Sequence, residues 1–148
     1  MFDPVINSLP AFAGFFLTAA VLLAGFIAVY LMVTPYKELA LIRAGNEAAA
    51  LSLGGVVIGF ALPIAVSVAV SHNLYAMIGW GVVAGVVQLL AYVVARLALP
   101  RLNEHILQGR AASGILVASL AIGVGILNAG CIVCPFKQSG RALMDFIK

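Results

Sequence analysis

The sequence predicts an all-α membrane protein with four transmembrane helices, arranged as two tandem helical hairpins of the same orientation with short interfacial helices. The chain of 148 residues is 64% hydrophobic and only 9% charged, and its mean hydropathy is +1.18. Its apolar residues collect in four runs, at 11–33, 48–70, 75–98 and 112–134. Each run is near or above the roughly 20 residues that a helix needs to cross about 30 Å of hydrocarbon. We therefore expect one transmembrane domain over residues 1–148.

The charges at the ends of the runs predict the orientation. The first run follows Asp3 and no basic residue, whereas a cleaved secretory signal begins with a basic region, so we expect this run to stay as a span. The connections 34–47 and 96–111 hold five basic residues, and the other side of the membrane holds three. The positive-inside rule then places both connections in the cytoplasm and both termini in the periplasm. The net charge of +3 is thus a topology signal, and no nucleic-acid partner is expected.

A shift of 64 residues aligns the chain with itself. It places Gly45 on Gly109 and Ala48 on Ala112, with further identities along both copies. This predicts an internal duplication, with repeat 1 at about 8–71, repeat 2 at about 72–135 and a short amphipathic C-terminal tail at 136–148. Because each copy holds two spans, both copies enter the membrane in the same orientation, and the pseudo-symmetry axis runs along the membrane normal.

A short polar segment joins the two spans of each copy, reading "YKELALIRAG" in the first and "RLNEHILQG" in the second. Tyr36, Leu39 and Ile42 recur at helical spacing with charges between them, which predicts a short helix lying at the membrane interface with its charges solvated. Gly45 is placed to end this helix in the left-handed conformation, and Asn46 is placed to cap the next one.

Small residues on the second and fourth spans predict close helix packing, because helices in lipid associate through van der Waals contact that small side chains permit. The predicted helix-packing positions are Ala48, Ser52, Gly55, Gly59 and Pro63 on the second span and Gly114, Ala118 and Gly125 on the fourth. Bulky side chains are concentrated on the first and third spans, so we expect these two spans to face more lipid.

Several residues together resemble a known family. They are Glu38-x-x-Leu41-Ile42-x-x-Gly45-Asn46-x-Ala48-Ala49-Ala50, then Gly55, Gly59 and Pro63, and "GILNAGC" at 125–131. This pattern is similar to the YjfL-like family of small bacterial inner-membrane proteins, a duplicated two-span domain of unknown function of the DUF350 type. The resemblance covers nearly the whole chain and implies four spans, the bacterial cytoplasmic (inner) membrane and a link to membrane stress, but no established reaction. The chain departs from the pattern at Arg110 and Cys134.

Few polar groups lie inside the spans, and no Asp, Glu, Lys or His lies near the middle of one. Proton-coupled exporters of this size depend on an intramembrane carboxylate, so this mechanism is disfavoured. Gln88 and Asn128 are the side chains most costly to leave unpaired in lipid. Two interpretations stay open: they form hydrogen bonds across helices or subunits, or they line a narrow polar pore in an oligomer.

Cys131 and Cys134 form a C-x-x-C pair at the outer end of the last span. The pair is compatible with a redox couple, a disulfide, part of a metal site, or two small side chains that simply fill a helix end. A metal site needs further ligands, and the only histidines are His72 and His105, the second expected on the opposite side of the membrane. We therefore expect no metal site. Pro135 is predicted to end the helix.

No catalytic or cofactor-binding motif is present, so the sequence predicts a non-enzymatic protein without a cofactor. The preferred hypothesis is a scaffold or sensor module that forms homo-oligomers through its small-residue faces and is linked to envelope or membrane stress. Its partners would be the lipid bilayer, further copies of the chain and envelope proteins. The alternative is a small channel or passive facilitator with a pore at the hairpin or subunit interface. The tail at 136–148 is compatible with a surface segment that docks on headgroups or a partner, and equally with a frayed terminus.

Overall fold

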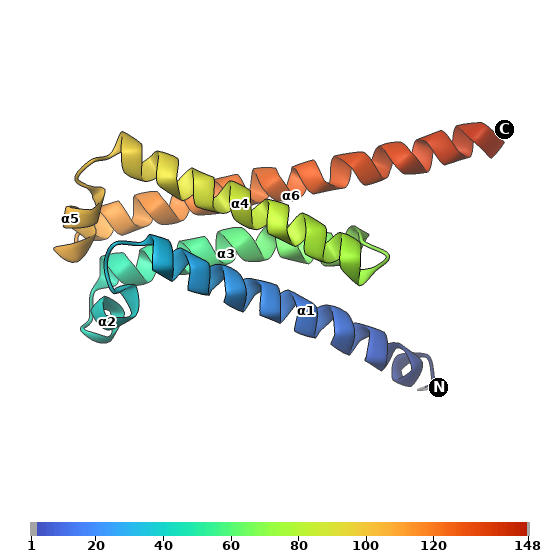
Figure 1. Cartoon of the computed structure of the whole chain (residues 1–148), viewed down its shortest axis with the longest axis horizontal. Helices are drawn as coiled ribbons and strands as arrows, with labels where there is room; N and C mark the ends of the chain where they lie inside the picture. The colour runs from blue at the N-terminus through green and yellow to red at the C-terminus, as the bar shows by residue number, and fades with distance from the viewer. Residues whose placement is uncertain (1–2, 148) are drawn as a thin grey trace.

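The computed structural model describes the backbone of residues 3–147 and the side chains of residues 6–135. The described chain is all helical, as Figure 1 shows. Its elements are α1 (Asp3–Val33), α2 (Glu38–Arg43), α3 (Glu47–Val70), α4 (Leu74–Ala98), α5 (Leu102–Leu107) and α6 (Ala111–Ile147). The long helices α1, α3, α4 and α6 form a bundle, the short helices α2 and α5 lie at one end of it, and both termini lie toward the other end (Figure 1).

The four predicted spans are confirmed as helices of sufficient length and apolarity to cross a membrane. They cover Ile6–Val33, Glu47–Val70, Leu74–Ala98 and Ala111–Pro135. The first begins earlier than its apolar run at 11–33, because the residues before the run continue the helix through Pro10. The all-α membrane fold class is therefore correct.

The two corners between spans have the predicted local structure. Gly45 and Gly109 both have positive φ, at 85° and 73°, a conformation that costs glycine least because it has no Cβ. The Ala49 backbone N–H donates to Asn46 Oδ1 at 3.0 Å, which caps the start of α3. The Asn46 side-chain amide also donates to the carbonyl oxygen of Ile106 at 2.8 Å. This second bond joins the start of α3 to the end of α5 and was not predicted.

Helices α3 and α6 form the closest contact of the bundle and run in the same direction. A Cβ atom added to Gly55 would overlap Ala118, and one added to Gly114 would overlap the backbone of Ala48. Further along, Gly125 lies directly against the backbone of Gly59. At these positions even a methyl group would force the two backbones apart, so the small side chains set the distance between the helices.

Aromatic side chains fill the space where α1 and α4 pack against this pair. The ring of Phe26 from α1 stacks on that of Phe60 from α3, with ring centroids 4.0 Å apart. The Tyr30 and Tyr92 rings meet edge to face at 5.1 Å. These side chains belong to one buried apolar core that reaches the end of the bundle where α2 and α5 lie.

Helix α1 is the most exposed of the four spans, as predicted, whereas the third span is less buried than the second but no less buried than the fourth. Only 11% of the most apolar stretch of α1 is buried, compared with 39% for α3 and 33% for both α4 and α6. Helix α4 is as buried as α6 and carries its own small residues: a Cβ atom added to Gly85 would meet Phe26 and Phe60 at ordinary van der Waals distance.

The prediction that Pro135 ends the last helix is also wrong. Helix α6 continues through Pro135 to Ile147. A proline removes one backbone hydrogen bond, but the following residues can still form theirs, and α1 and α3 also continue through Pro10 and Pro63. The predicted tail at 136–148 is therefore helical over the part whose backbone the structure describes. The environment of its side chains lies outside the described residues.

Candidate functional site

The residues predicted to pack helices come together inside one chain. Ala48, Ser52, Gly55, Gly59 and Pro63 are all buried along α3, and the three positions on α6 face them. Gly114 and Ala118 meet the first half of α3, and Gly125 meets Gly59. The surface that was predicted to join helices is thus occupied within the chain.

The two predicted intramembrane polar side chains both bond across helices. Gln88 of α4 is 2% exposed, and its side-chain amide donates to the carbonyl oxygen of Ala121 on α6 at 2.8 Å. The amide of Asn128 on α6 donates to the carbonyl oxygen of Ala84 on α4 at 3.3 Å. These bonds tie α4 to α6 from both sides, as the packing interpretation expects, because an amide in lipid is stabilised by a partner on another helix.

Glu38 does not lie where the sequence placed it. The expected interfacial helix had its charges in solvent and Leu39 in the membrane. In α2, however, Leu39 is 49% exposed and Glu38 is 0% exposed. The carboxylate therefore points into the end of the bundle, so the prediction that the charges of this short helix are solvated is wrong for Glu38. A carboxylate is thus buried in the helical core although no Asp, Glu, Lys or His lies near the middle of a span.

Glu38 is surrounded by hydroxyl groups from four parts of the chain. The Tyr30 hydroxyl of α1 donates to Glu38 Oε1 at 3.2 Å. Tyr36 precedes α2, Ser52 comes from α3 and Tyr92 from α4, and all three are buried. We call Tyr30, Tyr36, Glu38, Ser52 and Tyr92 the Glu38 cluster. It forms where α1, α2, α3 and α4 meet, so a change in it would alter the packing of these helices against one another.

Several polar atoms of the Glu38 cluster have no hydrogen-bond partner within the described part of the protein. Four buried oxygen atoms of the cluster meet no partner with hydrogen-bond geometry among the described residues. They are the hydroxyls of Tyr36, Ser52 and Tyr92 and the second carboxylate oxygen of Glu38. Each such atom costs about 1–3 kcal/mol when it is shielded from water. Buried polar groups of this kind are uncommon and are concentrated at functional sites.

The environment changes the acidity of Glu38. Burial raises its pKa from the ordinary value of 4.5 to about 7, although the hydrogen bond from the Tyr30 hydroxyl and the nearby Tyr36 hydroxyl partly oppose this rise. The pKa of Tyr36 is also raised, first by burial and then by the adjacent Glu38 and Tyr92. The nearest basic side chains, Lys37, Arg43 and Arg96, are exposed, and none forms an ion pair with Glu38 in the described part of the chain. Glu38 can therefore exchange its proton near neutral pH.

Two cavities adjoin the Glu38 cluster. One of about 440 Å³ lies against α2 and is lined by Thr34, Tyr36, Lys37 and Glu38 among others. It therefore lies beside a residue that is itself 0% exposed. The second, of about 20 Å³, lies between Gln88 and Tyr92. It has room for roughly one water molecule, which could pair the unpartnered atoms of both side chains.

Cys131 and Cys134 are exposed, free thiols on α6. They form no disulfide in this structure, and whether they act as a redox pair stays a prediction. Among the residues that the structure describes, no group of three His, Cys, Asp or Glu side chains is close enough together to hold a metal ion.

One sequence signal could have located Glu38. The 64-residue shift that aligns the two halves places Glu38 on Leu102, and Leu102 is 3% exposed. An apolar residue at the matching position of the second short helix indicates an inward-facing position, and the first half has a carboxylate there. The spacing of Tyr36, Leu39 and Ile42 instead left Glu38 among the charges expected in solvent.

Comparisons with known proteins match most of the chain. The family model described as Domain of Unknown Function (DUF350) matches residues 4–132. The UPF0719 inner membrane protein YjfL of Escherichia coli K12 is 31% identical over 128 residues, which is 86% of this chain and 97% of that protein. The UPF0719 transmembrane protein YshE of Bacillus subtilis is 30% identical over 128 residues, 85% of this chain and 96% of that protein. No solved structure gave a significant match.

Proposed function

This chain belongs to the DUF350 family of multi-pass membrane proteins, and from this premise we propose that it is a non-enzymatic sensor module of the inner membrane. In this proposal the Glu38 cluster is the part of the protein that senses the stimulus. The stimulus is a change in pH at the end of the bundle where the cluster lies. Such a change accompanies damage to an energised membrane. The proposal thus connects the module with membrane or envelope stress.

The burial of Glu38 at the junction of α1, α2, α3 and α4 is the observation that supports this function. With a pKa of about 7, the side chain is neutral below neutral pH and can remain buried beside Tyr30. Above neutral pH it ionises, and a buried carboxylate without a cation is strongly disfavoured. The short helix α2 then has to admit water through the adjoining cavity or move outward, so one proton separates two arrangements of this corner.

Hydrogen–deuterium exchange of the purified protein tests this response. We expect the amides of residues 38–43 to exchange faster at pH 8 than at pH 6, after correction for the pH dependence of the intrinsic exchange rate. The Glu38→Gln protein should be equally protected at both pH values, because the amide stays neutral. Glu47→Gln is the matched control, since Glu47 is exposed in the first turn of α3, and it should behave like the native chain. A pH response that survives Glu38→Gln would contradict the proposal.

We also propose that the chain assembles with further copies and with envelope proteins. The small-residue faces of α3 and α6 are occupied within the chain, so contact between copies would use the exposed apolar side of α1, where Phe12, Phe16 and Val21 are each more than half exposed. The two similar halves support the proposed internal duplication, since each has a long helix, a short helix and a second long helix. The alternative of a small channel has less support, because Gln88 and Asn128 both form interhelical hydrogen bonds.

The proposed orientation places α2 and α5 in the cytoplasm and both termini in the periplasm. Its support is the excess of basic residues in the two connections. A reporter active only in the periplasm should be active when fused to the C-terminus, and a cysteine introduced at Lys37 should resist labelling by a membrane-impermeant reagent in intact cells. Labelling at position 37 together with a silent C-terminal reporter would reverse the orientation.

A further inference from the structure

A cavity at the second short helix has the shape and lining of a lipid site. Its volume is about 470 Å³, within the range of about 300–1,000 Å³ that small-molecule sites occupy. It lies between the end of α4, the short helix α5 and the first turns of α6. It is lined by Leu99, Pro100, Arg101, Leu102, His105, Ala112, Ser113 and Leu116.

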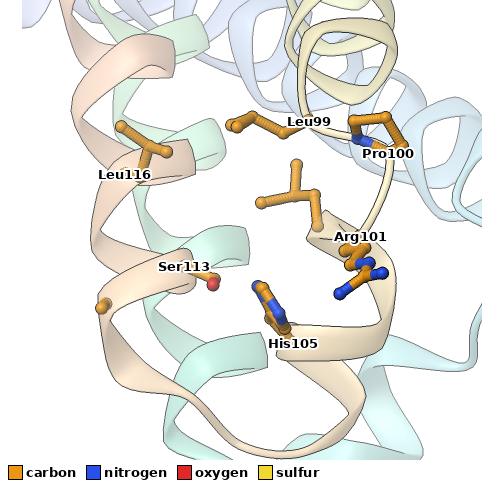
Figure 2. Close-up of a pocket in the computed structure, with 8 residues that line it drawn as sticks. Leu99, Pro100, Arg101, His105, Ser113 and Leu116 are labelled. Carbon is orange, nitrogen blue, oxygen red and sulfur yellow. The ribbon is translucent and has the colours of Figure 1, made fainter.

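The lining is divided into a polar end and an apolar end. Figure 2 shows Arg101, His105 and Ser113 grouped at one end of the space, and Leu99, Pro100 and Leu116 at the other. The apolar end is the deeper one in the bundle, because Leu116 lies almost one turn further into the span α6 than Ser113. The polar end lies at the level of α5, between the span that ends at Ala98 and the span that begins at Ala111.

We propose that this cavity binds an anionic glycerophospholipid from the bilayer. The Arg101 guanidinium supplies a positive charge with several N–H donors that match phosphate oxygens. The His105 imidazole and the Ser113 hydroxyl can add hydrogen bonds from α5 and α6. Glu104, the acidic residue of the same short helix, does not line the cavity, so no carboxylate opposes a phosphate there.

The remaining lining favours a lipid over a free phosphate. Leu99 and Leu116 are 38% and 41% exposed and face the region where acyl chains run. A lipid would place its phosphate at Arg101 and the first part of its chains along these leucines, whereas a free anion would leave them uncovered. Basic pockets beside transmembrane helices at the headgroup level bind anionic lipids in this way.

Native mass spectrometry of the full chain in detergent, supplied with dioleoylphosphatidylglycerol, tests the proposal. We expect retained lipid on the native protein and about tenfold weaker retention after Arg101→Gln, the loss that one charge-assisted contact produces. Arg101→Lys should recover part of the retention, because it restores the charge without the planar donors. Arg110→Gln is the matched control, since Arg110 is an exposed basic residue at the same end that does not line the cavity.

A second variant blocks the cavity while keeping every charge. Ala112→Phe places a ring in the space from an exposed position on α6, so we expect the protein to fold with native melting behaviour in lipid-free detergent but to lose phosphatidylglycerol. Phosphatidylcholine should be retained less well than phosphatidylglycerol by the native chain. Equal retention of phosphatidylglycerol by the Arg101→Gln, Ala112→Phe and Arg110→Gln proteins would overturn the proposal. If inorganic phosphate displaced the bound phosphatidylglycerol, the proposal that a lipid occupies the cavity would be overturned.

Discussion

Replacing Gly59 with leucine is expected to disrupt the bundle, with a loss of stability of at least about 3 kcal/mol. Overpacking usually costs about 1–3 kcal/mol when side chains can rearrange. Here the added atoms meet the carbonyl group of Ala121 and the side-chain amide of Gln88, and the backbone of Gly125 also lies against Gly59. Backbone atoms have no other rotamer to adopt, so α3 and α6 would have to separate along their contact.

The measurement is thermal unfolding in detergent, compared with two controls. Gly54→Leu is the matched control, because it makes the same change in the same helix at a position where a Cβ meets nothing within 4 Å. Leu90→Ala removes a side chain that is 58% exposed on the lipid side of α4. Both controls should melt near the native protein. If Gly59→Leu melts with them, close contact between α3 and α6 does not hold this fold together.

The second large effect concerns pH and Glu38. Because the pKa of Glu38 rises from 4.5 to about 7 on folding, the folded chain holds this proton more tightly than the unfolded chain. The contribution to stability is fully present below about pH 4.5, falls as the pH rises toward 7 and is absent above that. The difference in pKa corresponds to on the order of 3 kcal/mol, so the native chain should be clearly less stable at pH 8 than at pH 5.

Glu38→Gln isolates this contribution from the other titrating groups. The other titratable groups are present in both proteins, so the difference between the two melting curves cancels their contributions. We expect Glu38→Gln to be more stable than the native chain at pH 8 and to lose most of the advantage at pH 5. Glu47→Gln, at an exposed position, should follow the native curve. A constant difference between the native and Glu38→Gln proteins from pH 5 to pH 8 would show that Glu38 keeps an ordinary pKa.

The two predictions concern different parts of the same fold. Gly59 sets how closely two helices approach in the middle of the bundle. Glu38 and its hydroxyl neighbours join four elements at the end where the chain turns back into the membrane. A sensor of the kind proposed needs both: a rigid pair of helices as a frame and a corner whose packing depends on one proton.

The Glu38 cluster could not be predicted from local patterns, and the reason is geometric. Tyr30, Tyr92 and Ser52 lie on three different spans, and their hydroxyls approach Glu38 only after the bundle has formed. Local periodicity placed Leu39 at the membrane interface and left Glu38 among the solvated charges, but α2 is only six residues long. In a helix of fewer than two turns, contacts with the neighbouring spans decide which face is buried.

The close contact between α3 and α6 was predicted from the small residues of the second and fourth spans, but small residues alone do not identify the partner. Small side chains at Gly55 and Gly59 indicate that a helix can approach closely. They do not say whether the partner is a second copy or another span of the same chain. The structure answers this, because Ala118 and Gly125 on α6 meet them within one chain.

The sequence by itself determined the features that depend on composition and nearest neighbours. Hydropathy and run length determined the four spans, and the lack of a Cβ at Gly45 together with the capping side chain of Asn46 determined the corner between α2 and α3. Only the tertiary structure decided the burial of Glu38 and the pairing of α3 with α6 inside one chain. Both depend on contacts between segments that are far apart in the sequence. The energies of these contacts depend on which surfaces meet when the helices associate, and no single segment determines that.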